Sequence, residues 1–99
     1  MRIISVLVIL SFFLWNCTSC ESSPKEVSGV EIYKTRCLVC HGTDGKMGMN
    51  GAKDLSSSPL NVAQRIEVVT NGKNIMPKFK GIMSEEEIKA VVEFTMTLK

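Results

Sequence analysis

The run Cys37-Leu38-Val39-Cys40-His41 limits what this chain can fold into more than any other feature of its sequence. It holds two thiols and a histidine in the C-x-x-C-H spacing that is typical of covalent haem attachment. Cysteines three residues apart lie on the same face of a helical turn, so each thiol can bond one haem vinyl group. The next residue can then present its imidazole to the iron. We therefore predict Cys37 and Cys40 as the attachment sites of one haem c, and His41 as an axial ligand of its iron.

A zinc site and a thiol–disulfide redox pair are the alternative interpretations of this run. A structural zinc site needs four ligands. His41 is the only histidine, and the other two cysteines, Cys17 and Cys20, lie in the N-terminal leader. A thioredoxin-like motif would open a helix in a strand-rich α/β unit, and no β-rich pattern precedes Cys37. The haem interpretation is therefore favoured, and a purified protein without a Soret band would favour the alternatives.

The length and charge of the chain narrow its class further. A chain of 99 residues is long enough for one small domain. Twelve Lys and Arg residues against ten Asp and Glu residues give a formal net charge of +2, which is too small and too mixed to indicate a nucleic-acid partner. So short a chain buries little apolar surface and usually needs a cross-link, metal or cofactor to stabilise its fold. A covalently bound haem would provide this stabilisation.

The N-terminus is typical of a targeting segment. Its apolar stretch over residues 3–15 is shorter than the roughly 20 residues that a membrane-spanning helix needs. Leu14 lies three residues before Cys17, which resembles a bacterial lipoprotein cleavage site, and Cys20 is a competing lipid acceptor. We therefore predict a leader over residues 1–20 with a lipid on Cys17. An uncleaved anchor with two incidental cysteines is the alternative.

The leader is followed by a short polar segment. Residues 21–26 are small and polar and contain a proline, which is typical of a flexible tether, and we place this tether over residues 21–27. The folded domain is expected over residues 28–99. Together these segments predict an exported protein, held on the periplasmic side of a membrane by its lipid.

The folded region begins with the pattern of a helix. Ser28 can cap a first helix that carries the C-x-x-C-H run and ends at Gly42. Gly29 lies in its first turn, where glycine costs stability relative to alanine, so we expect a close helix–helix contact there. The glycine-rich residues 46–54 that follow would wrap one edge of the haem.

Two further helices are expected. Ser58-Pro59 is a typical helix start, with a capping serine and a proline at the first helical position, and Asn71-Gly72 would end this second helix. Ser84 and Glu87 form a capping-box pattern that opens a last helix reaching Leu98. The sequence therefore predicts an all-α fold with three main helices.

The C-x-x-C-H run, the Met76-Pro77 loop and the closing helix over residues 84–98 together resemble a small bacterial class I cytochrome c with one haem. The resemblance covers the whole domain over residues 28–99. It implies the cytochrome c fold, in which the helices and irregular loops wrap around one covalently bound haem.

The resemblance also implies how two of the helices meet. The family crosses its first and last helices at a contact between a small residue and aromatic rings. By position, Gly29 and Tyr33 of the first helix would lie against Val91 and Phe94 of the last.

In this family the methionine of a Met-Pro loop is the sixth iron ligand, which would be Met76 here. The residues themselves agree. Met76 lies in a loop 35 residues past His41, whereas Met47 and Met49 follow His41 closely and would lie near its own face of the haem. Pro77 restricts the backbone of Met76 toward extended values.

These ligands predict a one-electron carrier rather than an enzyme, because both axial positions of the iron are filled and no substrate can bind there. Histidine with a thioether favours ferrous iron, so the reduction potential should exceed that of a bis-histidine haem. We expect redox proteins of a respiratory-type chain as partners, and no small-molecule substrate. The alternative is a haem-based gas sensor in which Met76 leaves the iron, so that carbon monoxide binds readily to the reduced protein.

Four loop lysines could surround the exposed haem edge and steer an acidic partner, an effect that salt would weaken. They are Lys46, Lys73, Lys78 and Lys80. Ordinary solvated loop lysines are an equally good interpretation.

Overall fold

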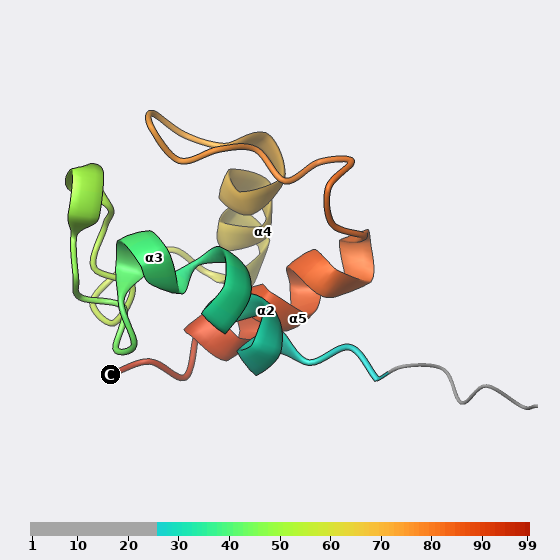
Figure 1. Cartoon of the computed structure of the whole chain (residues 1–99), viewed down its shortest axis with the longest axis horizontal. Coiled ribbons are helices and arrows are strands. Elements are labelled where there is room, and N and C mark those ends of the chain that lie inside the picture. Colours follow the sequence, from blue (N-terminus) through green and yellow to red (C-terminus); the bar gives the residue numbers. More distant parts are fainter. Residues whose placement is uncertain (1–25) are drawn as a thin grey trace, which may run out of the picture.

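The computed structural model describes residues 26–99, in which helices are joined by long loops (Figure 1). The helices are α2 (Gly29–Arg36), α3 (Leu38–His41), the 3-10 helix η1 (Met49–Gly51), α4 (Val62–Asn71) and α5 (Glu85–Thr95). Residues 26–99 form no strand and only two isolated β-bridges, so the predicted all-α fold is confirmed, with α2, α4 and α5 as its main helices. The predicted leader, with Cys17 and Cys20, and residues 21–25 lie outside the described residues.

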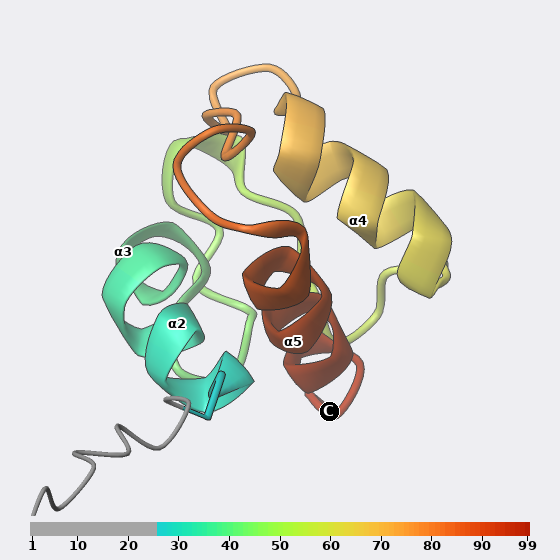
Figure 2. The same ribbon diagram turned by 90° about the vertical axis from the view of Figure 1, so that its right-hand side faces the viewer.

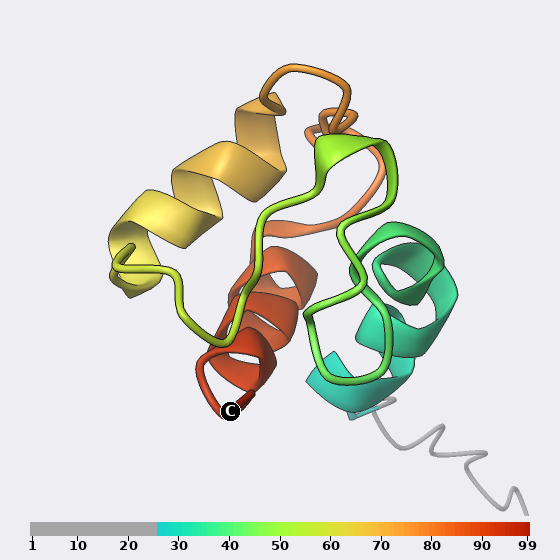
Figure 3. The same ribbon diagram turned by 90° about the vertical axis from the view of Figure 1, so that its left-hand side faces the viewer.

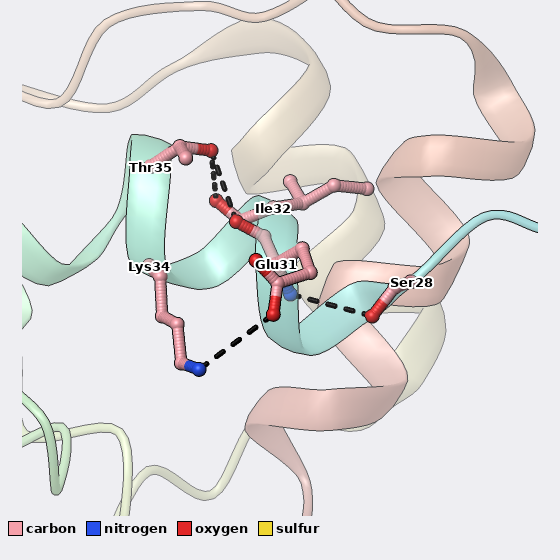
Figure 4. Close-up of polar contacts among 5 residues, drawn as sticks. All are labelled: Ser28, Glu31, Ile32, Lys34 and Thr35. Atoms are coloured by element: carbon pink, nitrogen blue, oxygen red, sulfur yellow. Dashed lines mark hydrogen bonds and ion pairs between the residues drawn. The ribbon is translucent and has the colours of Figure 1, made fainter.

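Helix α2 begins where the sequence predicts. The hydroxyl of Ser28 accepts a hydrogen bond from the Glu31 N–H at 3.4 Å, and Glu31 forms an exposed ion pair with Lys34 at 3.6 Å (Figure 4). The Thr35 hydroxyl donates back to the carbonyls of Glu31 and Ile32 at 3.0 and 3.1 Å. Such back-bonding competes with the helix ladder and bends helices.

The C-x-x-C-H run does not continue α2 as one helix, contrary to the prediction. Helix α2 ends at Arg36, and Cys37 is both its C-cap and the N-cap of α3. The Thr35 bonds just described are a physical reason for the break. The end of α3 is as predicted, because Gly42 follows His41 with a φ of +76° that favours glycine.

Helix α5 lies between α2 and α4 and packs against both (Figure 2). The predicted capping box opens it: the Ser84 hydroxyl accepts from the Glu87 N–H at 3.1 Å, and the Glu87 carboxylate accepts from the Ser84 N–H at 3.3 Å. Its buried side chains fall at helical spacing, and they are Ile88, Val91, Val92 and Thr95. The helix ends at Thr95, three residues before the predicted end at Leu98.

The contact between α2 and α5 depends on Gly29, as predicted. A Cβ added there would lie 2.7 Å from the carbonyl carbon of Ala90 and closer still to its oxygen. One turn further on, the rings of Tyr33 and Phe94 pack at 5.1 Å between centroids, tilted by 59°. Val91 belongs to the same buried core as Tyr33.

Helix α4 begins at Val62, so the predicted start at Ser58-Pro59 is wrong. Asn61 is the N-cap, and its side chain accepts from the Gln64 N–H at 2.9 Å while the Gln64 side chain accepts from the Asn61 N–H at 3.0 Å. The Ser58 hydroxyl instead accepts from the N–H of Leu60, two residues on, in the preceding loop. A reciprocal cap satisfies two backbone donors, which explains why the helix starts there.

Two long loops complete the part of the chain that the structure describes. The loop over residues 42–61 runs between the α2–α3 end and α4, across one side of α5 (Figure 3). The loop over residues 72–84 returns to α4, since the N–H groups of Phe79 and Lys80 bond the carbonyls of Val69 and Thr70 at 3.0 and 3.1 Å. None of the helices between residues 26 and 99 has the length and apolarity needed to cross a bilayer.

Candidate functional site

One cavity brings together all four site residues that the sequence predicts within the described part of the chain. Cys37, Cys40 and His41 line it from the α2–α3 end, and Met76 lines it from the loop after α4. Much of the remaining wall is apolar and comes from α4, α5 and the two loops. It includes Leu55, Val68, Val69, Phe79, Val91 and Val92.

The imidazole of His41 is oriented by the backbone. His41 is 9 % exposed, and its Nδ1 lies 3.1 Å from the carbonyl oxygen of Lys53. A carbonyl can only accept, so Nδ1 carries the proton and the lone pair is left on Nε2. Burial lowers the pKa of His41 and outweighs the effect of that hydrogen bond, so the ring is neutral near pH 7. A neutral imidazole held through its other nitrogen is ready to ligate a metal.

The turn after His41 is held from α2. The Tyr33 hydroxyl donates a buried hydrogen bond to the Gly42 carbonyl at 2.6 Å. Burial raises the pKa of Tyr33, so the phenol keeps its proton at neutral pH. The Met47 N–H bonds the His41 carbonyl at 3.0 Å and closes the turn. Tyr33 therefore fixes the backbone that carries His41.

The two thiols are free and half-buried. Burial raises the pKa of Cys37 to about 11, so its thiol is protonated at neutral pH. Attacking cysteines of thiol–disulfide enzymes instead have a lowered pKa. Residues 26–99 also contain no group of three His, Cys, Asp or Glu side chains that could hold a metal ion. Neither the dithiol nor the zinc interpretation is supported.

The loop that carries Met76 is a tight turn closed by its own backbone. The N–H of Lys73 bonds the Met76 carbonyl at 3.2 Å, and the N–H of Met76 bonds the Lys73 carbonyl at 3.0 Å. Asn74 has a φ of +55°, and a Cβ on Gly72 would lie 2.8 Å from the Met76 oxygen. Met76 is thus presented by a rigid turn on a segment separate from His41. Its side chain is half-buried.

Several residues that line the cavity were not predicted as site residues from the sequence. Met49 lines it, whereas Met47 does not and is 55 % exposed. Arg36 and Lys53, both exposed, line it too. Arg65 lines it as a buried charge. The sequence indicates only that Met49 lies close to the C-x-x-C-H run. The positions of the charged residues at the cavity depend on contacts between distant parts of the chain.

The four lysines expected around the haem edge do not gather there. Lys73 lines the cavity, but Lys80 lines a different hollow beside the start of α5. Lys46 and Lys78 are exposed and line neither. The cationic side chains at the cavity are therefore Lys73 together with Arg36, Lys53 and Arg65.

The residues present fit a covalently bound haem. Two free thiols and a neutral imidazole lie at one end of the cavity, a thioether lies on a separate loop, and aliphatic and aromatic side chains form much of the wall between. This donor set matches the histidine–methionine ligation of c-type haems.

Comparison with known proteins agrees with this fit. The family described as Cytochrome C oxidase, cbb3-type, subunit III matches residues 24–94. The chain is 33% identical to cytochrome c6 of Leptolyngbya boryana over 75 residues, which cover 70% of this chain and 87% of that protein. It is 31% identical to cytochrome c6 of Nostoc sp. over 97 residues, covering 92% and 86% of the two chains. It is 36% identical to cytochrome c6 of Anabaena variabilis over 76 residues, covering 71% and 87%.

The family match spans most of the described chain, and these relatives are electron carriers rather than enzymes. They imply one covalently bound haem c with its iron. The chain belongs to this cytochrome c family and is a small mono-haem cytochrome c that carries electrons.

Proposed function

We propose that this cytochrome is an exported, membrane-anchored shuttle that carries one electron at a time between the redox proteins of a respiratory-type chain. In this proposal Cys37 and Cys40 would bond the haem, and His41 and Met76 would ligate its iron. The observation that carries it is the shared cavity, in which the lone pair of a backbone-oriented imidazole and a thioether on a rigid turn lie among apolar walls.

Each of these residues has a separate role. When bound, the haem supplies a centre that gains and loses one electron. His41 keeps its orientation through the Lys53 carbonyl, and Met76 keeps its position through the turn that begins at Lys73. Because both ligands are held by the backbone, they need to move little when the charge of the iron changes. Apolar walls exclude water and favour the less charged, ferrous state.

The membrane anchor is proposed from the sequence alone. A lipid on Cys17, or on Cys20, would hold the domain at the periplasmic face of a membrane through the tether over residues 21–27. Mass spectrometry of the mature protein from its native membrane tests this directly. It should report one haem, an acyl group and an N-terminal cysteine, and a mature chain without an acyl group would contradict the anchor.

The ligand assignment is tested by three methionine variants. Met76→Ala should abolish the weak sulfur-to-iron absorption band. It should also lower the reduction potential by more than about 59 mV, a tenfold change in the redox equilibrium. Met47→Ala is the matched control, because Met47 is exposed and does not line the cavity, and it should change neither property. If Met49→Ala removes the band and Met76→Ala does not, Met49 is the ligand.

Carbon monoxide separates the shuttle from the gas-sensor alternative. With Met76 bound to the iron, the reduced protein should bind carbon monoxide poorly at neutral pH. Rapid binding, seen as a shift of the Soret band, would favour a sensor in which the methionine leaves. The Met76→Ala variant supplies the positive control for this measurement.

The exposed positive charges that line the cavity support an acidic partner. Arg36, Lys53 and Lys73 are exposed cationic residues that line the cavity. Positive charge beside a haem edge raises the rate of association with an acidic protein surface, and this effect falls as salt screens it. The rate of electron transfer to the physiological partner should therefore decrease as ionic strength rises.

A further inference from the structure

Arg65 is a charged side chain inside the wall of the haem cavity. It extends from α4, is 7 % exposed and lines the cavity together with Val69 and Thr95. Lysine and arginine are almost never buried this deeply without a partner. A buried arginine therefore needs a specific explanation.

The guanidinium of Arg65 is saturated with hydrogen bonds to neutral groups. Its Nε donates to the Leu60 carbonyl at 3.1 Å, and one terminal nitrogen donates to the carbonyl and hydroxyl of Thr95 at 3.2 and 3.1 Å. The other terminal nitrogen donates to the carbonyls of Leu55 and Ser58 at 3.2 and 3.3 Å. Five contacts satisfy all five N–H groups of an arginine.

These contacts solvate the charge without cancelling it. Every acceptor is a carbonyl or a hydroxyl, and within residues 26–99 no carboxylate forms an ion pair with Arg65. Arginine does not lose its proton in proteins. The Thr95 carbonyl lies at the C-terminal end of α5, where the helix dipole favours a cation. Arg65 is therefore a permanent positive charge that the fold holds in one place.

We propose that Arg65 sets the reduction potential of the haem upward, as a fixed charge that acts through space. This inference rests on the proposed function. Reduction adds one electron, donated by a partner protein, and lowers the positive charge of the iron centre. A nearby fixed cation makes that step more favourable. Because Arg65 is buried, dissolved salt screens it far less than it screens a surface charge.

Arg65 differs from the other arginine of the cavity in its burial. Arg36 also lines the cavity but is exposed to solvent. Its effect on the iron should be weak and should vanish at high salt. Arg36→Gln is thus a matched control for Arg65→Gln, since both variants remove one guanidinium from the same site.

The test is a redox titration of the purified holoprotein at low and high ionic strength. At a fixed ambient potential, Arg65→Gln should lower the ratio of ferrous to ferric protein about tenfold, which equals 59 mV for a one-electron couple. The shift should be the same at both ionic strengths. Arg65→Lys keeps the charge, so its ratio should stay within about threefold of the unmodified protein although it loses hydrogen bonds and melts earlier. Arg36→Gln should show a smaller shift that salt removes.

Distinct results would overturn the proposal. If the role of Arg65 were only structural, Arg65→Lys and Arg65→Gln would change the reduction potential by similar amounts. Each change would then follow the loss of thermal stability of that variant. If Arg65→Gln fails to give folded holoprotein, Arg65→Lys decides the matter, because a changed potential with the charge retained contradicts a charge effect. The sulfur-to-iron band must persist in these variants. A protein without haem would refute the proposed function itself, whereas an unchanged potential in Arg65→Gln refutes only the role of Arg65.

Discussion

Replacing Gly29 with alanine tests whether α2 and α5 are as close as the structure has them. Alanine is the better helix former by about 1 kcal/mol, and no left-handed φ forbids it at this position. If helix propensity were the only effect, Gly29→Ala should stabilise the protein. The contact with Ala90 predicts the opposite.

The size of the effect follows from the distances. The new methyl carbon would lie 2.7 Å from the carbonyl carbon of Ala90 and 3.2 Å from the Cβ of Phe94. Carbon atoms pack at about 3.5–4.0 Å, so the helices would have to separate by about 1 Å. The Ala90 atom belongs to the backbone and cannot rotate away. Overpacking of this kind costs up to about 3 kcal/mol, and the helix-propensity gain offsets about 1 kcal/mol of it.

We therefore expect Gly29→Ala to lower the free energy of unfolding by about 2 kcal/mol, which corresponds to a fall in Tm of about 8–16 °C for a domain of this size. The assay is thermal unfolding of the ferric holoprotein, followed by far-ultraviolet circular dichroism. Gly51→Ala is a useful comparison, because Gly51 has a φ of +79° and no atom within 4 Å of an added Cβ. It isolates backbone strain of about 1–2 kcal/mol from steric overlap. A Gly29→Ala protein that melts at or above the unmodified protein would refute the reasoning.

Three further substitutions test the contacts around the site and the start of α4. Tyr33→Phe leaves the Gly42 carbonyl buried without its donor, so guanidinium unfolding should show a loss of about 1–3 kcal/mol, and an unchanged midpoint would mean that the bond contributes nothing. Asn61→Ala removes the reciprocal cap of α4 and should cost about 0.5–2 kcal/mol in the same assay. Ser58→Ala should cost less than about 0.5 kcal/mol; a larger loss from Ser58→Ala than from Asn61→Ala would restore Ser58 as the cap.

The parts of the fold that local chemistry decides were predictable from the sequence. Ser84 and Glu87 satisfy each other three residues apart, and Gly42 and Gly72 end helices through their own φ values of +76° and +75°. The start of α4 shows the limit of such reasoning. Ser58-Pro59 and Asn61 are both good local starts, and the structure uses the second.

The position of Arg65 could not be predicted in this way. Charged residues are mostly exposed, so a helical arginine is expected at the surface by default. Its burial depends on the Thr95 carbonyl, 30 residues further along the chain, and on the Leu55 carbonyl, 10 residues before it. Backbone acceptors of this kind leave no trace in the identity of the residues that carry them. For the same reason, the hydrogen bond between the Lys53 carbonyl and His41 could not be predicted from the sequence.

The backbone therefore does most of the positioning at this site, and this suits a carrier of single electrons. His41 is oriented by one carbonyl, and the turn of Met76 is closed by two hydrogen bonds of its own main chain. The charge of Arg65 is held mainly by the carbonyls of the loop before α4 and of the end of α5. Main-chain groups within a packed fold cannot reorient as freely as water or surface side chains when the charge of the iron changes. A site built from them has little to rearrange between its two oxidation states, so its geometry favours rapid electron transfer in either direction.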